Sequence, residues 1–340
     1  MRFEAQVTVE GRDVDATLTV GAGRTLALLG PNGSGKSTAL EAIAGVVRPT
    51  RARIVLDGVE LVGAGRPVPP RERGIVLLAQ DDALFPMSVL DNVAFGPRAA
   101  GRRDAREVAG TWLERVGCAD LAARRPGELS GGQARRVAIA RALAAEPRVL
   151  LLDEPFAGLD VEAASSIRTM LRALLADVTA IVTTHDALDA HTLADDVAVM
   201  DGGRVVEAGA AAEVLTRPRT PFAARMAARV LVAGTMRGGA LELPSGARVP
   251  VSGGPGGGAA GAVALPPSAV ALAIGDAPRD RALAWIPDAV TALEPRGDEV
   301  RVVGATVAAD VDATVAAQLD AGADVWFGVP RGLAAYALTD

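Results

Sequence analysis

The order of hydrophobic and polar positions divides the chain into segments with strand spacing and segments with helix spacing. Residues 3–9 (FEAQVTV) and 15–20 (DATLTV) alternate between apolar and polar side chains, which predicts strands with one exposed face. Four further segments are apolar almost throughout, which is typical of strands buried on both faces of a parallel sheet. These segments are RTLALLG at 24–30, GIVLLAQ at 74–80, RVLLLDEP at 148–155 and VTAIVTTHD at 178–186.

Helical spacing lies between these apolar strands. Residues 37–47 and 161–177 repeat apolar positions three and four apart. The alternation of strand and helix predicts an α/β fold with a parallel sheet covered on both faces. A polar, helical stretch follows residue 82, with its clearest helix at 104–117. We therefore expect a helical subdomain over about residues 82–145, inserted into the α/β fold.

Beyond residue 229 the chain consists of short strand-like segments separated by proline and glycine, and helical spacing becomes scarce. The segment SGGPGGGAAG at 252–261 has the composition of a flexible loop. We expect two domains, an α/β domain over residues 1–228 and a small β-rich domain over residues 229–340.

Composition narrows the class of protein. A chain of 340 residues can bury an α/β core and a second, smaller domain. Half of its residues are hydrophobic, but no apolar run reaches the roughly 18 residues of a membrane span. The charged N-terminal segment lacks the apolar stretch of a signal peptide, so we expect a cytoplasmic protein. Cys118 is the single cysteine and excludes an internal disulfide, and a net charge of -6 disfavours nucleic acid as a partner.

A phosphate-binding loop is predicted where the first buried strand ends. The segment GPNGSGKST fits the spacing G-x-x-x-x-G-K-[ST] between a strand and a helix. Its glycines let backbone N–H groups approach phosphate oxygens, and the helix N-terminus adds a partial positive charge. Lys36 then reaches the β- and γ-phosphates, and Ser37 supplies an oxygen to Mg²⁺. A glycine turn with an incidental Lys-Ser pair is the alternative, which the flanking strand and helix disfavour. The loop comprises Gly30, Pro31, Asn32, Gly33, Ser34, Gly35, Lys36, Ser37 and Thr38.

Polar side chains end three of the other buried strands. Asp153 and Glu154 close one of them, where Asp153 can hold Mg²⁺ and Glu154 can orient or deprotonate an attacking water. His185 and Gln80 close two more strands, at the sheet edge where ligands of open α/β folds bind. There His185 can contact a γ-phosphate and the water, and Gln80 can reach Mg²⁺ or the water. The alternatives are solvated acids in a loop and satisfied polar residues at strand ends.

A second glycine-rich motif, LSGGQ, stands at residues 129–133 before a helical segment. Taken in chain order with the phosphate loop, Gln80, LLLDEP, AGLD at 157–160 and His185, it closely resembles the nucleotide-binding subunit of ATP-binding cassette (ABC) transporters. The resemblance covers about residues 1–225. It implies an ABC-type P-loop ATPase with ATP and Mg²⁺ as cofactors. It also implies that Glu154 is the catalytic base, His185 the switch and Gln80 the γ-phosphate sensor.

The same resemblance implies a head-to-tail homodimer. In that arrangement the signature motif of one copy, with Ser130, Gly131, Gly132 and Gln133, covers the ATP on the phosphate loop of the other copy. Asp160 then crosses the interface near the opposite phosphate loop. Such subunits usually stack adenine on an early aromatic residue, whereas Phe3 is the only aromatic residue before Gly30. We therefore expect either loose selectivity for the base or an aliphatic contact with it from around Val14.

Two further segments resemble importer ATPases. The stretch after Gln80 resembles the groove for a coupling helix of the membrane subunit, with Leu84, Phe85, Met87 and Val89 around Pro86. Ordinary subdomain core is the alternative for these side chains. The tail resembles the small β-barrel (TOBE, or molybdate-binding-protein-like) regulatory domain of such importers. It is most like the molybdate subgroup in VALPPSAVAL, VTALEPRGDEVRV and VWFGVP.

The resemblance therefore implies a peripheral ATPase on the cytoplasmic face of the membrane, driving uptake of an oxyanion, with molybdate favoured. Its partners would be integral permease subunits and, indirectly, a periplasmic or extracellular substrate-binding protein, without nucleic acid. Importers of sulfate, ferric iron, polyamines or sugars are alternatives with the same fold. A soluble cassette ATPase acting on nucleic acid or the ribosome, and an oxyanion storage protein with a vestigial ATPase, are alternatives from other classes.

Overall fold

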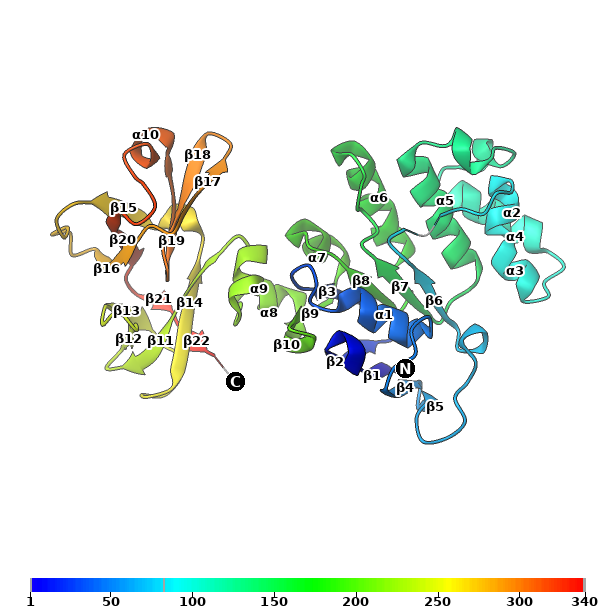
Figure 1. Ribbon diagram of the computed structural model, residues 1–340, viewed down its shortest axis with the longest axis horizontal. Helices are drawn as coiled ribbons and strands as arrows, with labels where there is room; N and C mark the ends of the chain where they lie inside the picture. The colour runs from blue at the N-terminus through cyan, green and yellow to red at the C-terminus, as the bar shows by residue number, and fades with distance from the viewer. Residues whose placement is uncertain (1, 82, 339–340) are drawn as a thin grey trace. The chain divides into compact units, whose positions relative to one another are not determined.

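The structure is a computed structural model that describes residues 2–81 and 83–338, and it divides into two compact units, Met1–Ala212 and Glu213–Asp340 (Figure 1). The sequence placed this division later, after residue 228. Residues 213–228 belong instead with the second unit, where α9 (Pro221–Met226) packs on β11 (Val230–Arg237). Helical spacing alone does not reveal which domain a helix covers, and this is why the predicted boundary falls too late.

A six-stranded sheet in the order β10-β9-β3-β8-β7-β6 forms the centre of the first unit. All neighbouring strands are parallel except the edge strand β10, which is antiparallel to β9. Every residue of β3 and β7 is buried, as their continuous apolar sequences predict. The strands are β3 (Thr25–Leu29), β6 (Ile75–Leu78), β7 (Val149–Asp153), β8 (Ala180–Thr183), β9 (Asp196–Asp201) and β10 (Arg204–Ala210).

The first unit also contains an antiparallel sheet with the strand order β2-β1-β4-β5. Its long strands β1 and β2 alternate between buried and exposed side chains, as the alternating sequence predicts. The buried side of these strands shares one core with helix α1 (Lys36–Ala44) and with side chains of the central sheet such as Leu151. The strands are β1 (Arg2–Val9), β2 (Val14–Gly21), β4 (Arg51–Leu56) and β5 (Val59–Val62).

The opposite face of the central sheet is covered by helices. Leu150 and Leu152, the neighbours of Leu151 on β7, share a second core with α5 and α6. Because successive side chains of a strand point to opposite faces, one strand supplies both cores. Helices α2, α4 and α5 pack on one another within the predicted helical subdomain, whose first residue, 82, lies outside the described residues. The helices are α2 (Val89–Val93), α3 (Phe95–Ala99), α4 (Ala105–Arg115), α5 (Gly131–Ala144), α6 (Val161–Leu174) and α7 (Ala187–Leu193).

The second unit is rich in strands, which confirms the expected β-rich tail. Three sheets surround one hydrophobic core, in the orders β21-β13-β12-β11-β14-β22, β15-β20-β16 and β17-β18-β19. Helix α8 (Ala211–Thr216) lies at the division between the units, and α10 (Ala313–Ala316) is a single short turn. The remaining strands are β12 (Ala240–Glu242), β13 (Arg248–Ser252), β14 (Ala260–Leu265), β15 (Ala271–Ile274), β16 (Leu283–Ala289), β17 (Ala292–Arg296), β18 (Glu299–Val303), β19 (Ala308–Asp312), β20 (Asp324–Pro330), β21 (Leu333–Ala334) and β22 (Tyr336–Ala337).

Across residues 2–81 and 83–338, none of the helices combines the length and the apolar character that a membrane crossing requires.

Candidate active site

The predicted phosphate loop connects β3 to α1, in the strand and helix context that the sequence suggested. Two of its glycines, Gly30 and Gly35, leave no room for a side chain. A Cβ atom on Gly30 would lie 2.3 Å from the carbonyl oxygen of Met200, and one on Gly35 would lie 2.6 Å from a methyl group of Val14. Gly35 also has a positive φ of 98° as the residue that opens α1. The loop therefore holds a tight conformation that brings its backbone to the start of a helix.

Lys36 lies under this loop and is almost fully buried. Its Nζ donates to the carbonyl oxygens of Gly30 at 2.9 Å and Pro31 at 3.0 Å. Burial lowers the pKa of the Lys36 ammonium, while the negative charges of Glu154 and Asp153 oppose that shift. The loop, its lysine and the two carboxylates are therefore close enough to influence one another electrostatically.

The loop also contains a polar atom suited to an anion. The hydroxyl oxygen of Ser34 is buried and has no hydrogen-bond partner among residues 2–81 and 83–338. An unsatisfied buried hydroxyl is costly, so a group that pairs with it stabilises the loop. Phosphate oxygens accept hydrogen bonds from hydroxyl, ammonium and backbone N–H donors. The donors of this loop therefore fit a nucleotide phosphate.

Two predicted carboxylates lie at the end of β7. Asp153 is buried, and its Oδ1 accepts a hydrogen bond of 2.6 Å from the hydroxyl of Thr183 on β8. Glu154 follows with a positive φ of 44°, a conformation that is strained for any residue with a side chain. Its carboxylate Oε2 lies 3.8 Å from Nδ1 of His185, whose side chain is 64% exposed. The structure thus brings Asp153, Glu154 and His185 to one edge of the sheet, as predicted.

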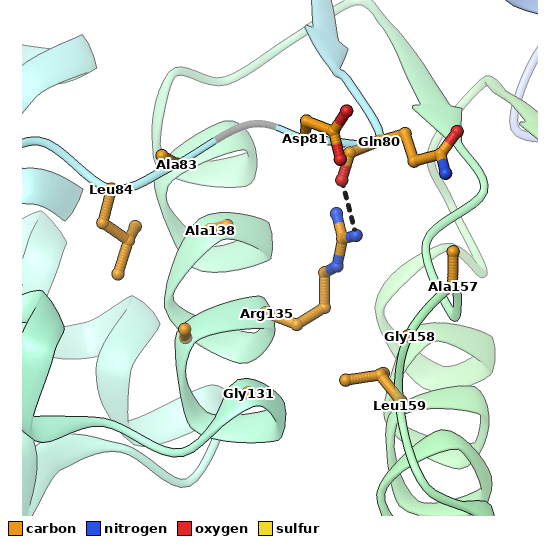
Figure 2. Close-up of a pocket in the computed structure, with 11 residues that line it drawn as sticks. Gln80, Asp81, Ala83, Leu84, Gly131, Arg135, Ala138, Ala157, Gly158 and Leu159 are labelled. Carbon is orange, nitrogen blue, oxygen red and sulfur yellow. Dashed lines mark hydrogen bonds between the residues drawn. The ribbon is translucent and has the colours of Figure 1, made fainter.

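Gln80 follows β6 and is exposed at the same edge. The guanidinium of Arg135 on α5 donates to the carbonyl oxygen of Gln80 at 2.9 Å and to that of Ala79 at 3.5 Å. Figure 2 shows this contact across a cavity of about 250 Å³, with residues 157–159 on the far side. Through Arg135, helix α5 is therefore hydrogen-bonded to the main chain of Gln80, the predicted γ-phosphate sensor.

The signature motif begins α5, with Ser130 as its N-cap. The Ser130 hydroxyl accepts from the Gln133 backbone at 3.3 Å, and Oε1 of Gln133 accepts from the Ser130 backbone at 3.0 Å. These bonds form a capping box, in which each residue satisfies a backbone donor at the helix start. Ser130 and Gly131 are exposed, and both bonds stay within their own helix. Within one chain the motif therefore shapes a helix N-terminus that faces solvent.

Asp160 also caps a helix and is exposed. Its Oδ1 accepts a 2.8 Å hydrogen bond from the backbone of Ala163 at the start of α6. The next residue, Val161, is 85% exposed. Asp160 and Val161 therefore both lie on the surface of a single chain.

Val14 itself does not provide an aliphatic contact with a base, which was one of two possibilities that the sequence left open. Val14 is 1% exposed and packs beneath Gly35, so its side chain is not available to a nucleotide. Phe3 is fully buried as well. The alternating pattern of β1 and β2 already points both side chains to the inner face of the sheet.

Sequence reasoning missed three residues that support this site. Arg168 on α6, Asp189 on α7 and the hydroxyl of Thr184 form a network beside His185. The Arg168 atoms Nε and Nη2 both lie 2.7 Å from Asp189 Oδ1, and Thr184 donates to Asp189 Oδ2 at 2.6 Å. The sequence around Asp189 and Arg168 did not indicate a role for either residue. Their pairing depends on the packing of two helices, α6 and α7.

Known proteins are similar to this chain over the residues that form this site. A protein-family model described as ABC transporter matches residues 14–157. The molybdenum import ATP-binding protein ModC of Mycobacterium tuberculosis is 43% identical over 352 residues, covering 96% of this chain and 95% of ModC. The spermidine/putrescine import ATP-binding protein PotA of Frankia alni is 45% identical over 223 residues, covering 63% of this chain and 47% of PotA.

A solved structure agrees with these relatives. An ATP-binding cassette of an ABC transporter, in its ADP conformation, superposes with a TM-score of 0.55 at 27% identity and covers 64% of this chain and 96% of that one. The resemblance inferred from the motifs is thereby confirmed, together with the P-loop fold and nucleotide binding. The chain belongs to the ABC transporter family, as one of its ATP-hydrolysing nucleotide-binding proteins.

Proposed function

We propose that this chain is the ATPase subunit of an importer for an oxyanion, and that the oxyanion is molybdate. One observation carries the proposal. The similarity to ModC extends over 96% of the chain and so includes the β-rich second unit, whereas the similarity to PotA covers 63%. Cassette ATPases share their nucleotide site whatever they transport, so similarity outside that site is the better guide to cargo.

The phosphate loop Gly30–Thr38 would bind the ATP phosphates. Lys36 supplies positive charge, Ser34 an unpaired hydroxyl, and α1 its N-terminus. Ser37, Asp153 and Gln80 offer the hydroxyl, carboxylate and amide oxygens that Mg²⁺ prefers, so these residues fit the ion. When bound, Mg²⁺ would neutralise charge that develops on the phosphates.

Glu154 would act as the general base. Its carboxylate lies 3.8 Å from His185 and is 17% exposed, which keeps it near the sheet edge but reachable by water. Proton transfer requires a base within hydrogen-bond reach of the attacking water, and a carboxylate at this strand end, close enough to influence Lys36 electrostatically, would be placed for that role. His185 would orient the γ-phosphate and the water. Most of the rate acceleration then comes from electrostatic positioning.

Two copies would complete each site. Ser130, Gly131, Gly132 and Gln133 begin an exposed helix N-terminus, which is suited to an anion but is occupied within one chain only by its own capping box. In a head-to-tail pair this end of α5 would cover the ATP of the other copy, and Asp160 would lie at the same interface.

The permease would dock on the helical subdomain, which would place the protein at the cytoplasmic face of the membrane. Phe85 and Phe95 are 37% and 46% exposed, and their ring centroids lie 4.9 Å apart. The guanidinium of Arg141 lies over the Phe85 ring at 4.9 Å. Exposed aromatic side chains with an adjacent arginine are typical of interface hot spots. Val89, which the sequence placed in this groove, is fully buried and belongs to the subdomain core.

The decisive experiment is ATP hydrolysis by the complete transporter. The chain would be reconstituted with its permease in liposomes, with the cognate substrate-binding protein and one of molybdate, sulfate or spermidine. We expect molybdate to stimulate hydrolysis most strongly. Equal stimulation by sulfate would make the carrier a general oxyanion importer, and stimulation by spermidine alone would favour the polyamine alternative that the PotA similarity supports.

A further inference from the structure

Thr183 occupies a position from which one hydroxyl contacts both carboxylate residues of the proposed site. It is the last residue of β8, is fully buried and stands opposite Asp153 in the parallel pairing of β7 with β8. Its Oγ1 lies 2.6 Å from Asp153 Oδ1 and 2.8 Å from the backbone nitrogen of Glu154. We propose that Thr183 is a positioning residue, whose hydroxyl fixes Asp153 and Glu154 in their working geometry.

The chemistry of the hydroxyl fixes the direction of both hydrogen bonds. The backbone N–H of Glu154 is a donor only, so the Thr183 oxygen must accept from it. The single hydroxyl proton is then directed at Asp153, which must accept it through Oδ1. This arrangement leaves the second carboxylate oxygen of Asp153, Oδ2, for other partners.

The hydrogen bond between Glu154 and Thr183 holds a strained backbone conformation in place. Glu154 has a φ of 44°, and a non-glycine residue holds such a conformation only where its surroundings maintain it. The hydrogen bond from the Glu154 backbone to Thr183 is one such restraint. It directs the residue's side chain to the sheet edge where His185 lies. Loss of the hydroxyl would therefore release both carboxylates at once, although Thr183 contacts neither nucleotide nor water in this role.

The proposal rests on the roles of Asp153 and Glu154 given above, and it is tested by three variants. Thr183→Val removes the hydroxyl and preserves shape, and Thr183→Ser restores the hydroxyl. Thr25→Val changes another buried threonine, at the opposite end of neighbouring strand β3, and controls for a general cost of this substitution in the sheet. If Thr183→Val does not fold, Thr183→Ala carries the same predictions.

The first readout uses nucleotide-free protein. Because the Glu154 amide donates to Thr183, its hydrogen exchange, resolved by NMR, should be roughly tenfold or more faster in Thr183→Val, and unchanged in Thr183→Ser. The second readout separates kcat from binding. A hydrogen bond to a charged group is worth roughly a tenfold to hundredfold change, so kcat should fall by that factor in Thr183→Val. The dissociation constant for ATP without divalent metal should stay within about twofold, since the phosphate loop is untouched.

Three results would overturn the proposal: parental kcat in Thr183→Val, unchanged exchange of the Glu154 amide, or an equal loss of kcat in Thr183→Ser or Thr25→Val. Failure of the proposed function is distinguishable. In that case Glu154→Gln would hydrolyse ATP at the parental rate, while the exchange measurement would still report whether the hydroxyl holds the Glu154 backbone.

Discussion

The ion pair between Arg168 and Asp189 gives the strongest prediction about stability. The Arg168 side chain is 13% exposed and the Asp189 side chain is 3% exposed, so the pair is largely withdrawn from water. In Arg168→Met the Asp189 carboxylate stays buried and loses its cationic partner, while the hydrogen bond from Thr184 remains. Breaking a buried pair from one side costs about 3–5 kcal/mol. We expect a loss of that size in the free energy of unfolding of the α/β unit.

The pH dependence of that loss has a definite sign. Burial raises the pKa of Asp189, and the hydrogen bonds from Thr184 and Arg168 partly offset the shift. Without Arg168 the folded-state pKa of Asp189 rises further above its unfolded value. A group with a raised folded pKa contributes stability below the unfolded pKa and loses that contribution as the pH rises through the folded pKa. The deficit of Arg168→Met should therefore be smallest in acid and largest at neutral pH.

Urea denaturation followed by far-ultraviolet circular dichroism is the assay, because α1 to α7 all lie in the first unit and supply most of the helical signal. Arg172→Met, one turn along the same helix at an exposed position, is the matched control and should change stability by less than about 0.5 kcal/mol. The double variant Arg168→Met with Asp189→Leu should recover part of the loss, because no unpaired charge remains. A single variant as stable as the control, or a double variant without recovery, would show that the buried pair does not stabilise the α/β unit.

Two further predictions concern the helical subdomain. Phe85→Ser should weaken binding to the permease by about tenfold or more in a pull-down titration and leave ATP hydrolysis by the isolated chain unchanged. The control Val206→Ser, at a 50% exposed position on β10, should not change binding. Equal binding of the permease by both variants would count against the docking surface. Cys118 is fully buried, and burial raises the pKa of its thiol, so a thiol reagent should label it only as fast as the subdomain opens. Labelling of the native protein at the rate of a free cysteine would contradict that burial.

Much of the α/β unit was predictable because its strands are buried on both faces. An apolar segment such as residues 148–155 is stable mainly as a strand inside a parallel sheet. The polar residues that follow its apolar part then lie at the carboxyl edge of that sheet. The sequence was therefore sufficient to predict that Asp153, Glu154 and His185 lie at the same edge of the sheet.

The features that sequence did not predict depend on contacts between distant segments. Thr183 is a polar residue at the end of an apolar strand, but only the register of β8 against β7 places it opposite Asp153. Arg168 and Asp189 are separated by a strand and meet through the packing of α6 and α7. Val89 and Val14 were assigned to surfaces and are buried, because an apolar side chain in sequence does not show which of its neighbours will cover it.

If two copies of the chain complete each other's ATP sites, Glu154→Gln should dimerise in the presence of ATP and Mg²⁺, which sedimentation measures. Without the general base, ATP should persist at the interface, so this variant should sediment as a dimer with ATP and as a monomer without it. Ser130→Arg added to the same variant should retain ATP but remain monomeric, because the arginine blocks the cover over the partner's nucleotide. A Glu154→Gln protein that stays monomeric with bound ATP would contradict the shared ATP sites. Hydrolysis of ATP by this variant at the parental rate would contradict the assignment of Glu154 as the general base.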